Sequence, residues 1–186
     1  MLLEKETSCV VLIDVQEKLT PFVQEADALV ARCQWVIHLA KELGIPLLVS
    51  EQYPSGLGDT VEPLHSLIAQ GECFEKVHFS CFRQPAFKQS LKALNKKQLV
   101  LIGIEAHVCV LQSAMEMKTA GYEVYLVVDA VSSRSQLDYS YGLRRMEQAG
   151  IHLVTSEMVF FEWVGQAGTP QFKALSKAYL QQKDKQ

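Results

Sequence analysis

The sequence contains no apolar stretch that approaches the roughly 18 residues needed to cross a membrane. Its first residues, Met-Leu-Leu-Glu-Lys-Glu-Thr, lack the basic region and the apolar core of a secretory signal. They also lack the arginines typical of a transit peptide. We therefore expect a cytoplasmic protein with no membrane partner.

Paired cysteines are also missing. The chain has five cysteines, an odd number, and no Cys-x-x-Cys motif. This usage indicates reduced thiols in a cytosolic setting rather than a disulfide framework. Cys9 and Cys33 lie in apolar patterns and are predicted to be packing residues, whereas no role for Cys73 or Cys81 can be read from their neighbours.

Nucleotide-binding motifs are absent as well. Residues 54–59 are rich in glycine but lack the Gly-Lys-Ser/Thr ending of a phosphate-binding loop, and we interpret them as a loop over a site. Gly56-Leu-Gly58 has no third glycine at the position that a dinucleotide fingerprint requires. We expect no NAD or FAD and no other cofactor. The net charge of −3, with scattered basic residues, favours no nucleic-acid partner.

What the sequence does contain is an alternation of strand and helix patterns over 186 residues, 48% of them hydrophobic. This is typical of one α/β domain, residues 1–186, with a three-layer α/β/α architecture and a mostly parallel, Rossmann-like six-stranded sheet. Strands are predicted at residues 8–14, 46–51, 74–76, 98–104, 123–129 and 152–155. Helices are predicted at residues 26–43, 61–68, 85–94, 108–120, 135–149 and 170–182.

Cys109 is the most informative residue. It follows an apolar strand pattern that Gly103 ends, and it precedes the apolar spacing of a helix. At such a turn, helix N–H groups and the positive end of the helix dipole can stabilise a thiolate. A small buried packing residue is the alternative, because free cysteine is among the most buried residue types.

Asp14 and Lys76 each end a strand-like segment too. Alone, Asp14 is well explained as a helix cap and Lys76 as a solvated surface charge. However, the carboxyl ends of parallel strands gather at one edge of a sheet, where ligands bind. A carboxylate, an ammonium group and the Cys109 thiol are therefore candidates for one common site.

The pattern resembles the isochorismatase-like cysteine hydrolases, the superfamily of nicotinamidases and N-carbamoyl amidohydrolases. Residues 11–16 resemble its first motif with Asp14 as the acid, Lys76 matches the lysine position, and residues 103–110 resemble the nucleophile motif. Residues 50–58 resemble the isochorismatase domain-containing branch, whose substrates are mostly unassigned. The resemblance extends from residue 8 to residue 179.

If the three residues meet, their chemistry assigns their roles. Cys109 attacks a carbonyl carbon, and Lys76 favours the thiolate. Asp14 takes the thiol proton, returns it to the leaving amine and then activates water. The resemblance further implies an oxyanion hole made of the backbone N–H groups of Glu105 and Cys109, and a cis peptide bond between Ile104 and Glu105.

The resemblance also directs attention to metal ligands, because nicotinamidases carry an Asp-x-His and a further His after the second strand. This chain has Glu51-Gln52-Tyr53 there and no histidine until His65, so no catalytic metal is expected. Gln16, Glu51 and Gln52 are instead predicted to bind the substrate. This departure disfavours nicotinamide itself.

His107 suggests a Cys-His pair, but it lies two residues before Cys109 on a turn that directs the two side chains apart. We expect His107 to be a supporting or surface histidine.

The leading hypothesis is a metal-independent hydrolase of a small amide or related C–N bond. Vinyl-ether hydrolysis of the isochorismatase type, and a catalytically silent binding domain, are the alternatives.

The resemblance finally implies a homo-oligomer acting on a small molecule. The apolar residues 158–163 are candidates for a subunit contact, and equally for packing under the last helix.

Overall fold

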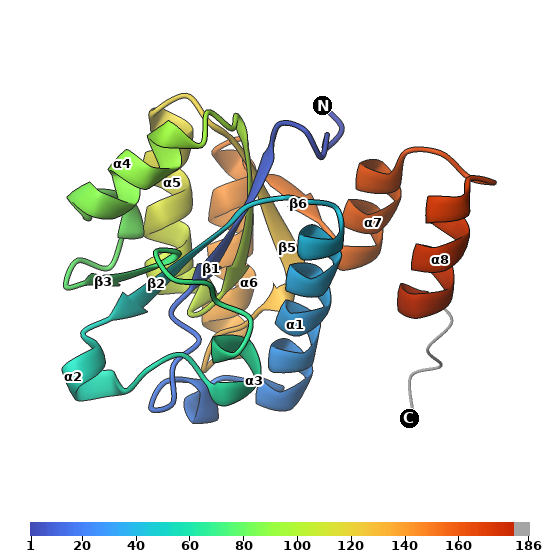
Figure 1. Cartoon of the computed structure of the whole chain (residues 1–186). Coiled ribbons are helices and arrows are strands. Elements are labelled where there is room, and N and C mark those ends of the chain that lie inside the picture. Colours follow the sequence, from blue (N-terminus) through green and yellow to red (C-terminus); the bar gives the residue numbers. More distant parts are fainter. Residues whose placement is uncertain (181–186) are drawn as a thin grey trace.

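Six strands form the centre of the molecule, in the spatial order β3-β2-β1-β4-β5-β6 (Figure 1). The computed structural model describes residues 1–180. All neighbouring strands are parallel, which confirms the predicted six-stranded sheet. The strands are β1 (Ser8–Ile13), β2 (Leu47–Gln52), β3 (Cys73–Lys76), β4 (Gln98–Gly103), β5 (Glu123–Val131) and β6 (His152–Val154).

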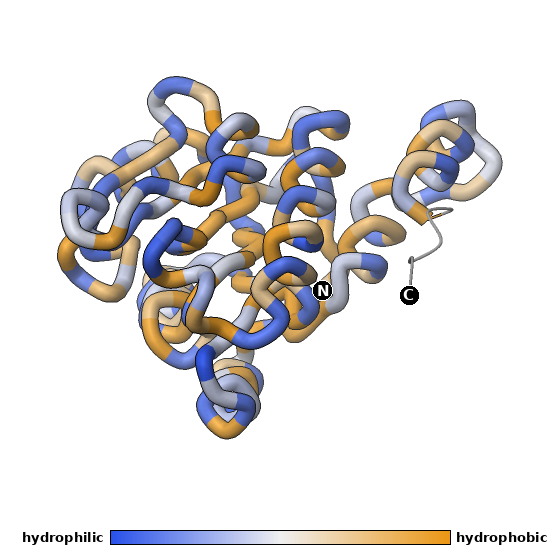
Figure 2. The backbone as a smooth tube through the Cα atoms, turned by 90° about the horizontal axis from the view of Figure 1, so that it is seen from below, coloured by the Kyte–Doolittle hydropathy of each residue, from blue (hydrophilic) through white to orange (hydrophobic). Residues whose placement is uncertain are grey.

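Helices cover both faces of this sheet, so the predicted three-layer architecture is also confirmed (Figure 1). Their turns alternate between hydrophilic and hydrophobic residues, as expected of helices with one face against a core (Figure 2). On one face lie α1 (Ala26–Glu42) and α7 (Ser156–Val164), with α8 (Pro170–Tyr179) outside them. On the other lie α4 (Pro85–Ala93), α5 (Leu111–Thr119) and α6 (Gln136–Gln148).

Strand alternation divides the apolar residues between the two layers. In β1, Val10 and Leu12 join the core under α1 and α7, whereas Val11 and Ile13 join the core under α4, α5 and α6. A parallel sheet buried on both faces needs such continuous apolar strands. Cys9 and Cys33 are fully buried, which confirms their prediction as packing residues.

Several short elements differ from the sequence-based expectation. The loop predicted at residues 54–59 contains α2 (Pro54–Leu57), and the helix predicted at residues 61–68 is the single turn α3 (Glu62–His65). The predicted helix at residues 108–120 starts with a π-helical turn, η3 (Ala106–Val110). Two 3₁₀ turns, η1 (Thr20–Phe22) and η2 (Cys81–Arg83), complete the elements. The predicted end of the last helix at residue 182 lies outside the described residues.

Helix α7 is not predicted from the sequence, because apolar residues fill nearly every position of residues 158–164 and obscure the helical period. Val159, Phe160 and Trp163 are buried in the core, whereas Met158 and Phe161 are about half exposed. Most of this segment therefore packs within the chain, beneath α8. Within residues 1–180, no helix has both the length and the apolar character that a membrane crossing requires.

Gly103 allows β1 and β4 to approach each other closely at their carboxyl ends. Its φ is +118°, and a Cβ there would overlap the carbonyl oxygen of Ile13 and lie 2.8 Å from its nitrogen. The same carbonyl accepts a hydrogen bond from the N–H of Ile104. A side chain at position 103 would therefore separate β4 from β1.

Replacing Gly103 with Ala should lower the free energy of unfolding by about 2 kcal/mol or more, because a rigid backbone group must move. The control is Gly44→Ala, at a φ of +69° where no atom lies within 4 Å of the added Cβ. It should cost only about 1 kcal/mol. Urea unfolding of both variants measures the difference, and equal losses would contradict the close approach.

Candidate active site

The strand order places β1 and β4 at the point where the chain changes its direction across the sheet. From β1 the sheet continues to β2 and β3 on one side, and to β4, β5 and β6 on the other. In open α/β sheets, ligands bind outside the carboxyl ends of the strands at such a switch point. Asp14 follows β1 directly, and Lys76 ends β3.

Asp14 and Lys76 form a buried ion pair. Lys76 Nζ lies 2.6 Å from Asp14 Oδ2, and the two side chains are 1% and 0% exposed. Burial raises the pKa of Asp14, although the charge and hydrogen bond of Lys76 counteract this effect. The raised pKa makes the carboxylate a stronger base than an exposed aspartate.

Two neighbours complete the bonding of this pair. Ser50 Oγ donates to Asp14 Oδ1 at 2.7 Å, so both carboxylate oxygens are bound. Lys76 Nζ also donates to Gln52 Oε1 at 2.7 Å, and Gln52 Nε2 donates to the carbonyl of Val77. Ser50 and Gln52, both on β2, therefore hold Asp14 and Lys76 in place.

Cys109 lies in the π-helical turn η3 directly before α5, and it is nearly buried. Asp14 and Lys76 are the charged groups that act on the pKa of its thiol. Burial raises the pKa of Cys109 and the charge of Asp14 raises it further, whereas Lys76 lowers it. The net effect is a pKa above the ordinary thiol value, so Cys109 is protonated at neutral pH.

Lys76 lowers the pKa of Cys109 in the expected direction, but burial and the charge of Asp14 outweigh this effect, so the resting site does not favour a thiolate. The charges of Asp14 and Lys76 already cancel. A thiolate beside them would leave one uncompensated negative charge in a buried place, which is unfavourable.

The residues before Cys109 place backbone N–H groups at the same edge. The peptide bond between Ile104 and Glu105 is cis, as the family resemblance implies. The N–H of Glu105 makes no hydrogen bond to another part of the described chain, whereas that of Ala106 donates to the carbonyl of Ser132 at 2.8 Å.

Gln52 is the one predicted substrate-binding residue that contacts the ion pair. Gln16 is fully buried, and its side chain binds only backbone groups. Its Nε2 donates to the carbonyls of Gln52 and Gly58, and its Oε1 accepts from the N–H of Gln52. These bonds join the end of β2 to the loop after α2.

Glu51 does not join Asp14, Lys76 and Gln52. It points to the opposite face of the sheet from Ser50 and Gln52, because side chains alternate along a strand. Its carboxylate accepts hydrogen bonds from the N–H and hydroxyl of Thr60, at 2.7 and 2.6 Å. In this position Glu51 orders the connection after β2.

His107 does not bind Cys109, which agrees with the expected supporting role. Its Nδ1 lies 3.0 Å from the Ser133 hydroxyl.

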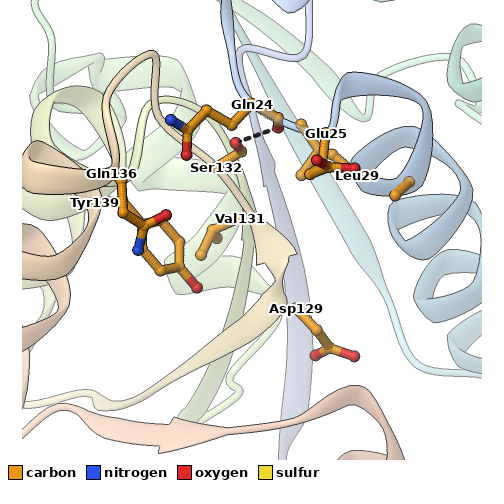
Figure 3. A pocket seen from close by; sticks show the side chains of 9 residues that line it. Gln24, Glu25, Leu29, Asp129, Val131, Ser132, Gln136 and Tyr139 are labelled. Atoms are coloured by element: carbon orange, nitrogen blue, oxygen red, sulfur yellow. Dashed lines mark hydrogen bonds between the residues drawn. The ribbon is translucent and has the colours of Figure 1, made fainter.

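Within residues 1–180, no group of three or more His, Cys, Asp or Glu side chains has a geometry that could hold a metal ion. A cavity of about 270 Å³ near the end of β5 is lined by Gln24, Ser132 and Tyr139 among others, and not by the ion pair (Figure 3).

Sequence reasoning missed Ser50 and Arg134. Ser50 interrupts the apolar β2 one strand away from Asp14, and this polar residue was the available signal. Arg134 binds the Glu105 carboxylate, with Nη2 at 2.7 Å from Oε1. It lies 29 residues further along the chain, so no local pattern connects the two residues.

Comparison with known proteins gives consistent matches. Residues 8–158 match the family model described as the isochorismatase domain. Isochorismatase domain-containing protein 2A of Mus musculus is 40% identical over 174 residues, which are 92% of this chain and 82% of that protein. Isochorismatase domain-containing protein 1 of Salmo salar is 36% identical over 87% of this chain, which spans 57% of that relative's length.

Comparison with solved structures gives the same family. The MAR1 ribonuclease from Caenorhabditis elegans matches with a TM-score of 0.90 and 37% identity, over 98% of this chain and 94% of that one. The Escherichia coli YcaC protein, described as an octameric hydrolase of unknown specificity, has the same fold, with a TM-score of 0.86, 24% identity and 96% coverage of each chain. The chain therefore belongs to the isochorismatase family of hydrolases.

Proposed function

We propose that this protein is a metal-independent cysteine hydrolase that cleaves a small amide or a related C–N bond. Asp14, Lys76 and Cys109 are its catalytic residues, within a single hydrolase domain. The observation that carries the proposal is the buried ion pair, 2.6 Å between Lys76 Nζ and Asp14 Oδ2, whose two members both interact with the Cys109 thiol.

In the first half-reaction, Cys109 Sγ bonds to the carbonyl carbon and the thiol proton moves to Asp14. The backbone N–H groups of Glu105 and Cys109 stabilise the oxyanion, a contribution of about 3–4 kcal/mol per donor. The C–N bond then breaks as Asp14 returns the proton to the nitrogen. A thioester on Cys109 and a free amine result.

In the second half-reaction, Asp14 takes a proton from water, which attacks the thioester carbon. The C–S bond breaks, the thiol regains a proton, and a carboxylic acid leaves. Lys76 remains charged throughout and pairs with whichever neighbour is negative. The proton transfer therefore moves charge within the site without changing its total.

Gln52 is the best placed of the predicted substrate-binding residues, because it contacts Lys76 at the end of β2. Gln16 and Glu51 support the site through the backbone bonds described above. A homo-oligomer is also proposed. The octameric state described for the E. coli neighbour and the half-exposed Met158 and Phe161 on α7 support it.

A ribonuclease activity is the alternative suggested by the C. elegans neighbour's description. Against it stand the net charge of −3 and the small, buried arrangement of the three reactive groups. Vinyl-ether hydrolysis would use Asp14 and Lys76 without the thiol.

Replacing Cys109 with Ala should reduce hydrolysis of small amides by at least ~10³-fold, because the nucleophile is lost. The control is Cys73→Ala, a cysteine on the opposite face of the sheet, which should leave the rate unchanged. A panel of small amides, an enol-ether and a short RNA are assayed with the three proteins. If Cys109→Ala retains full activity on the enol-ether, vinyl-ether hydrolysis replaces the present proposal, whereas RNA cleavage would favour the ribonuclease.

Replacing Asp14 with Asn should change two rates in opposite directions. Amide hydrolysis should fall by about 10²–10⁴-fold, because the base is lost. Alkylation of Cys109 by iodoacetamide should become several-fold faster between pH 7 and 9, because the negative charge that raises the pKa of Cys109 is gone while Lys76 remains. Asn also tolerates the φ of +54° at this position.

Mass spectrometry of the labelled peptides follows both Cys109 and Cys73 in the same sample. The Cys73 rate should not change, because its pKa is raised by burial and by Glu51 and Glu75 rather than by Asp14. In the wild type, Cys109 labelling should keep increasing above pH 9. A plateau below pH 8 would show that the resting site holds a thiolate after all.

Dialysis against a strong chelator should leave the hydrolysis rate unchanged. The expectation rests on the absence of a metal-ligating cluster within residues 1–180. Rates are measured before dialysis, after it, and after addition of zinc or iron. A loss that one of these metals restores would show that the protein has a metal site and would contradict the expectation.

A further inference from the structure

The turn that carries Cys109 is held by the segment that follows β5. Residues 132–134 are consecutive, and each binds one of the consecutive residues 105–107. Bonds to three consecutive residues fix both the position and the orientation of the turn.

Arg134 makes the strongest of these contacts. Its Nη2 lies 2.7 Å from Glu105 Oε1, its Nε lies 3.1 and 3.0 Å from the two carboxylate oxygens, and its backbone N–H donates to Oε2 at 3.0 Å. The planar guanidinium group matches a carboxylate in this bidentate way, which lysine cannot do. Burial raises the pKa of Glu105, but the bonds and charge of Arg134 outweigh this effect and the pKa is lowered.

Ser132 and Ser133 add further bonds. The Ser132 carbonyl accepts from the N–H of Ala106, and the Ser133 hydroxyl meets His107 Nδ1 at 3.0 Å. Gln24 in turn binds both serines. Ser132 Oγ donates to the carbonyl of Gln24 at 2.7 Å (Figure 3), and the N–H of Gln24 donates to the Ser133 carbonyl at 3.0 Å. The segment is thus anchored independently of the turn that it holds.

We propose that Arg134 is a positioning residue for catalysis, which holds Glu105 so that its backbone N–H points at the developing oxyanion. The inference rests on the proposed function, because that function assigns the oxyanion donor. Arg134 is not among the main causes that shift the pKa of Asp14 or Cys109. Its side chain is 58% exposed, whereas that of Glu105 is 9% exposed. The exposed guanidinium group thus meets a nearly buried carboxylate, and its bidentate bonds fix the orientation of that carboxylate.

The chain offers a matched control for this pair. Arg83 and Glu116 also form an ion pair of 2.7 Å, with an arginine side chain that is 60% exposed. That pair joins η2 to α5 and does not touch the nucleophile turn. The variants to compare are therefore Arg134→Gln, Arg134→Lys and Arg83→Gln.

The probe for the oxyanion is p-nitrophenyl acetate, which needs no knowledge of the natural substrate. Attack by Cys109 Sγ forms an acetyl thioester, releases p-nitrophenolate and transfers the thiol proton to Asp14. Arg134→Gln should slow this acylation by about 10–100-fold, since removal of one oxyanion donor costs about 10²–10³. Arg134→Lys should recover part of the rate, and Arg83→Gln should stay within about 2-fold of the wild type.

Iodoacetamide separates positioning from a general loss of structure. Its reaction with Cys109 displaces iodide and forms no oxyanion, so Arg134→Gln should change it by less than about 2-fold. An equal decrease of both reactions would overturn the proposal, because Arg134 would then act on the thiol or on the fold. Unchanged acylation in Arg134→Gln would overturn it as well.

Hydrogen exchange distinguishes this proposal from the proposed function. If the wild type gains no acetyl group on Cys109, the cysteine-hydrolase function fails. The role of Arg134 is then decided by the amides of residues 105–111. Faster exchange of these amides in Arg134→Gln, but not in Arg83→Gln, supports the proposal that Arg134 positions the turn. Unchanged exchange overturns that proposal.

Discussion

The structure depends on one interaction, the ion pair of Asp14 and Lys76 inside the carboxyl edge of the sheet. A single charge at this depth would be strongly unfavourable, but two opposite charges 2.6 Å apart cancel each other's field. Ser50 and Gln52 satisfy the remaining bonding capacity of both groups. Because the pair is neutral as a whole, any third group beside it must also be neutral in the resting state. This constraint explains why burial raises the pKa of Cys109 even though an ammonium group is adjacent.

The same constraint connects the fold to the chemistry. In the proposed mechanism, transfer of the thiol proton to Asp14 would convert one ion pair, Asp14 with Lys76, into another, Cys109 with Lys76. The total charge of the buried site does not change, so the transfer avoids the full penalty of creating a thiolate in an apolar place. The proposed transfer requires the three side chains to be close together, and a parallel sheet brings the ends of β1 and β3 and the turn after β4 to one edge.

Much of this arrangement could be predicted from the sequence, and the failures have physical reasons. The alternating strands and helices predict the sheet, and polar residues at strand ends single out Asp14 and Lys76. Glu51 and Gln52 look equivalent in the sequence, yet they lie on opposite faces, because one step along a strand reverses the side chain. Arg134 lies far from Glu105 in the chain, so only the folded structure pairs them. The raised pKa of Cys109 was not expected, since burial cannot be judged from a helix-end pattern alone.

The cysteines show why acidity alone does not identify a nucleophile in this chain. All five lie within the described residues, and burial raises the pKa of each, to about 12 for Cys9, Cys73 and Cys81. The carboxylate of Glu51 also raises the pKa of Cys73, and no cation is among the main causes that shift it. Cys109 has both a carboxylate that can accept its proton and an ammonium group that can pair with the resulting thiolate. The proposed reactivity of Cys109 therefore rests on the presence of both partners, and the sheet edge that holds them determines which thiol has them.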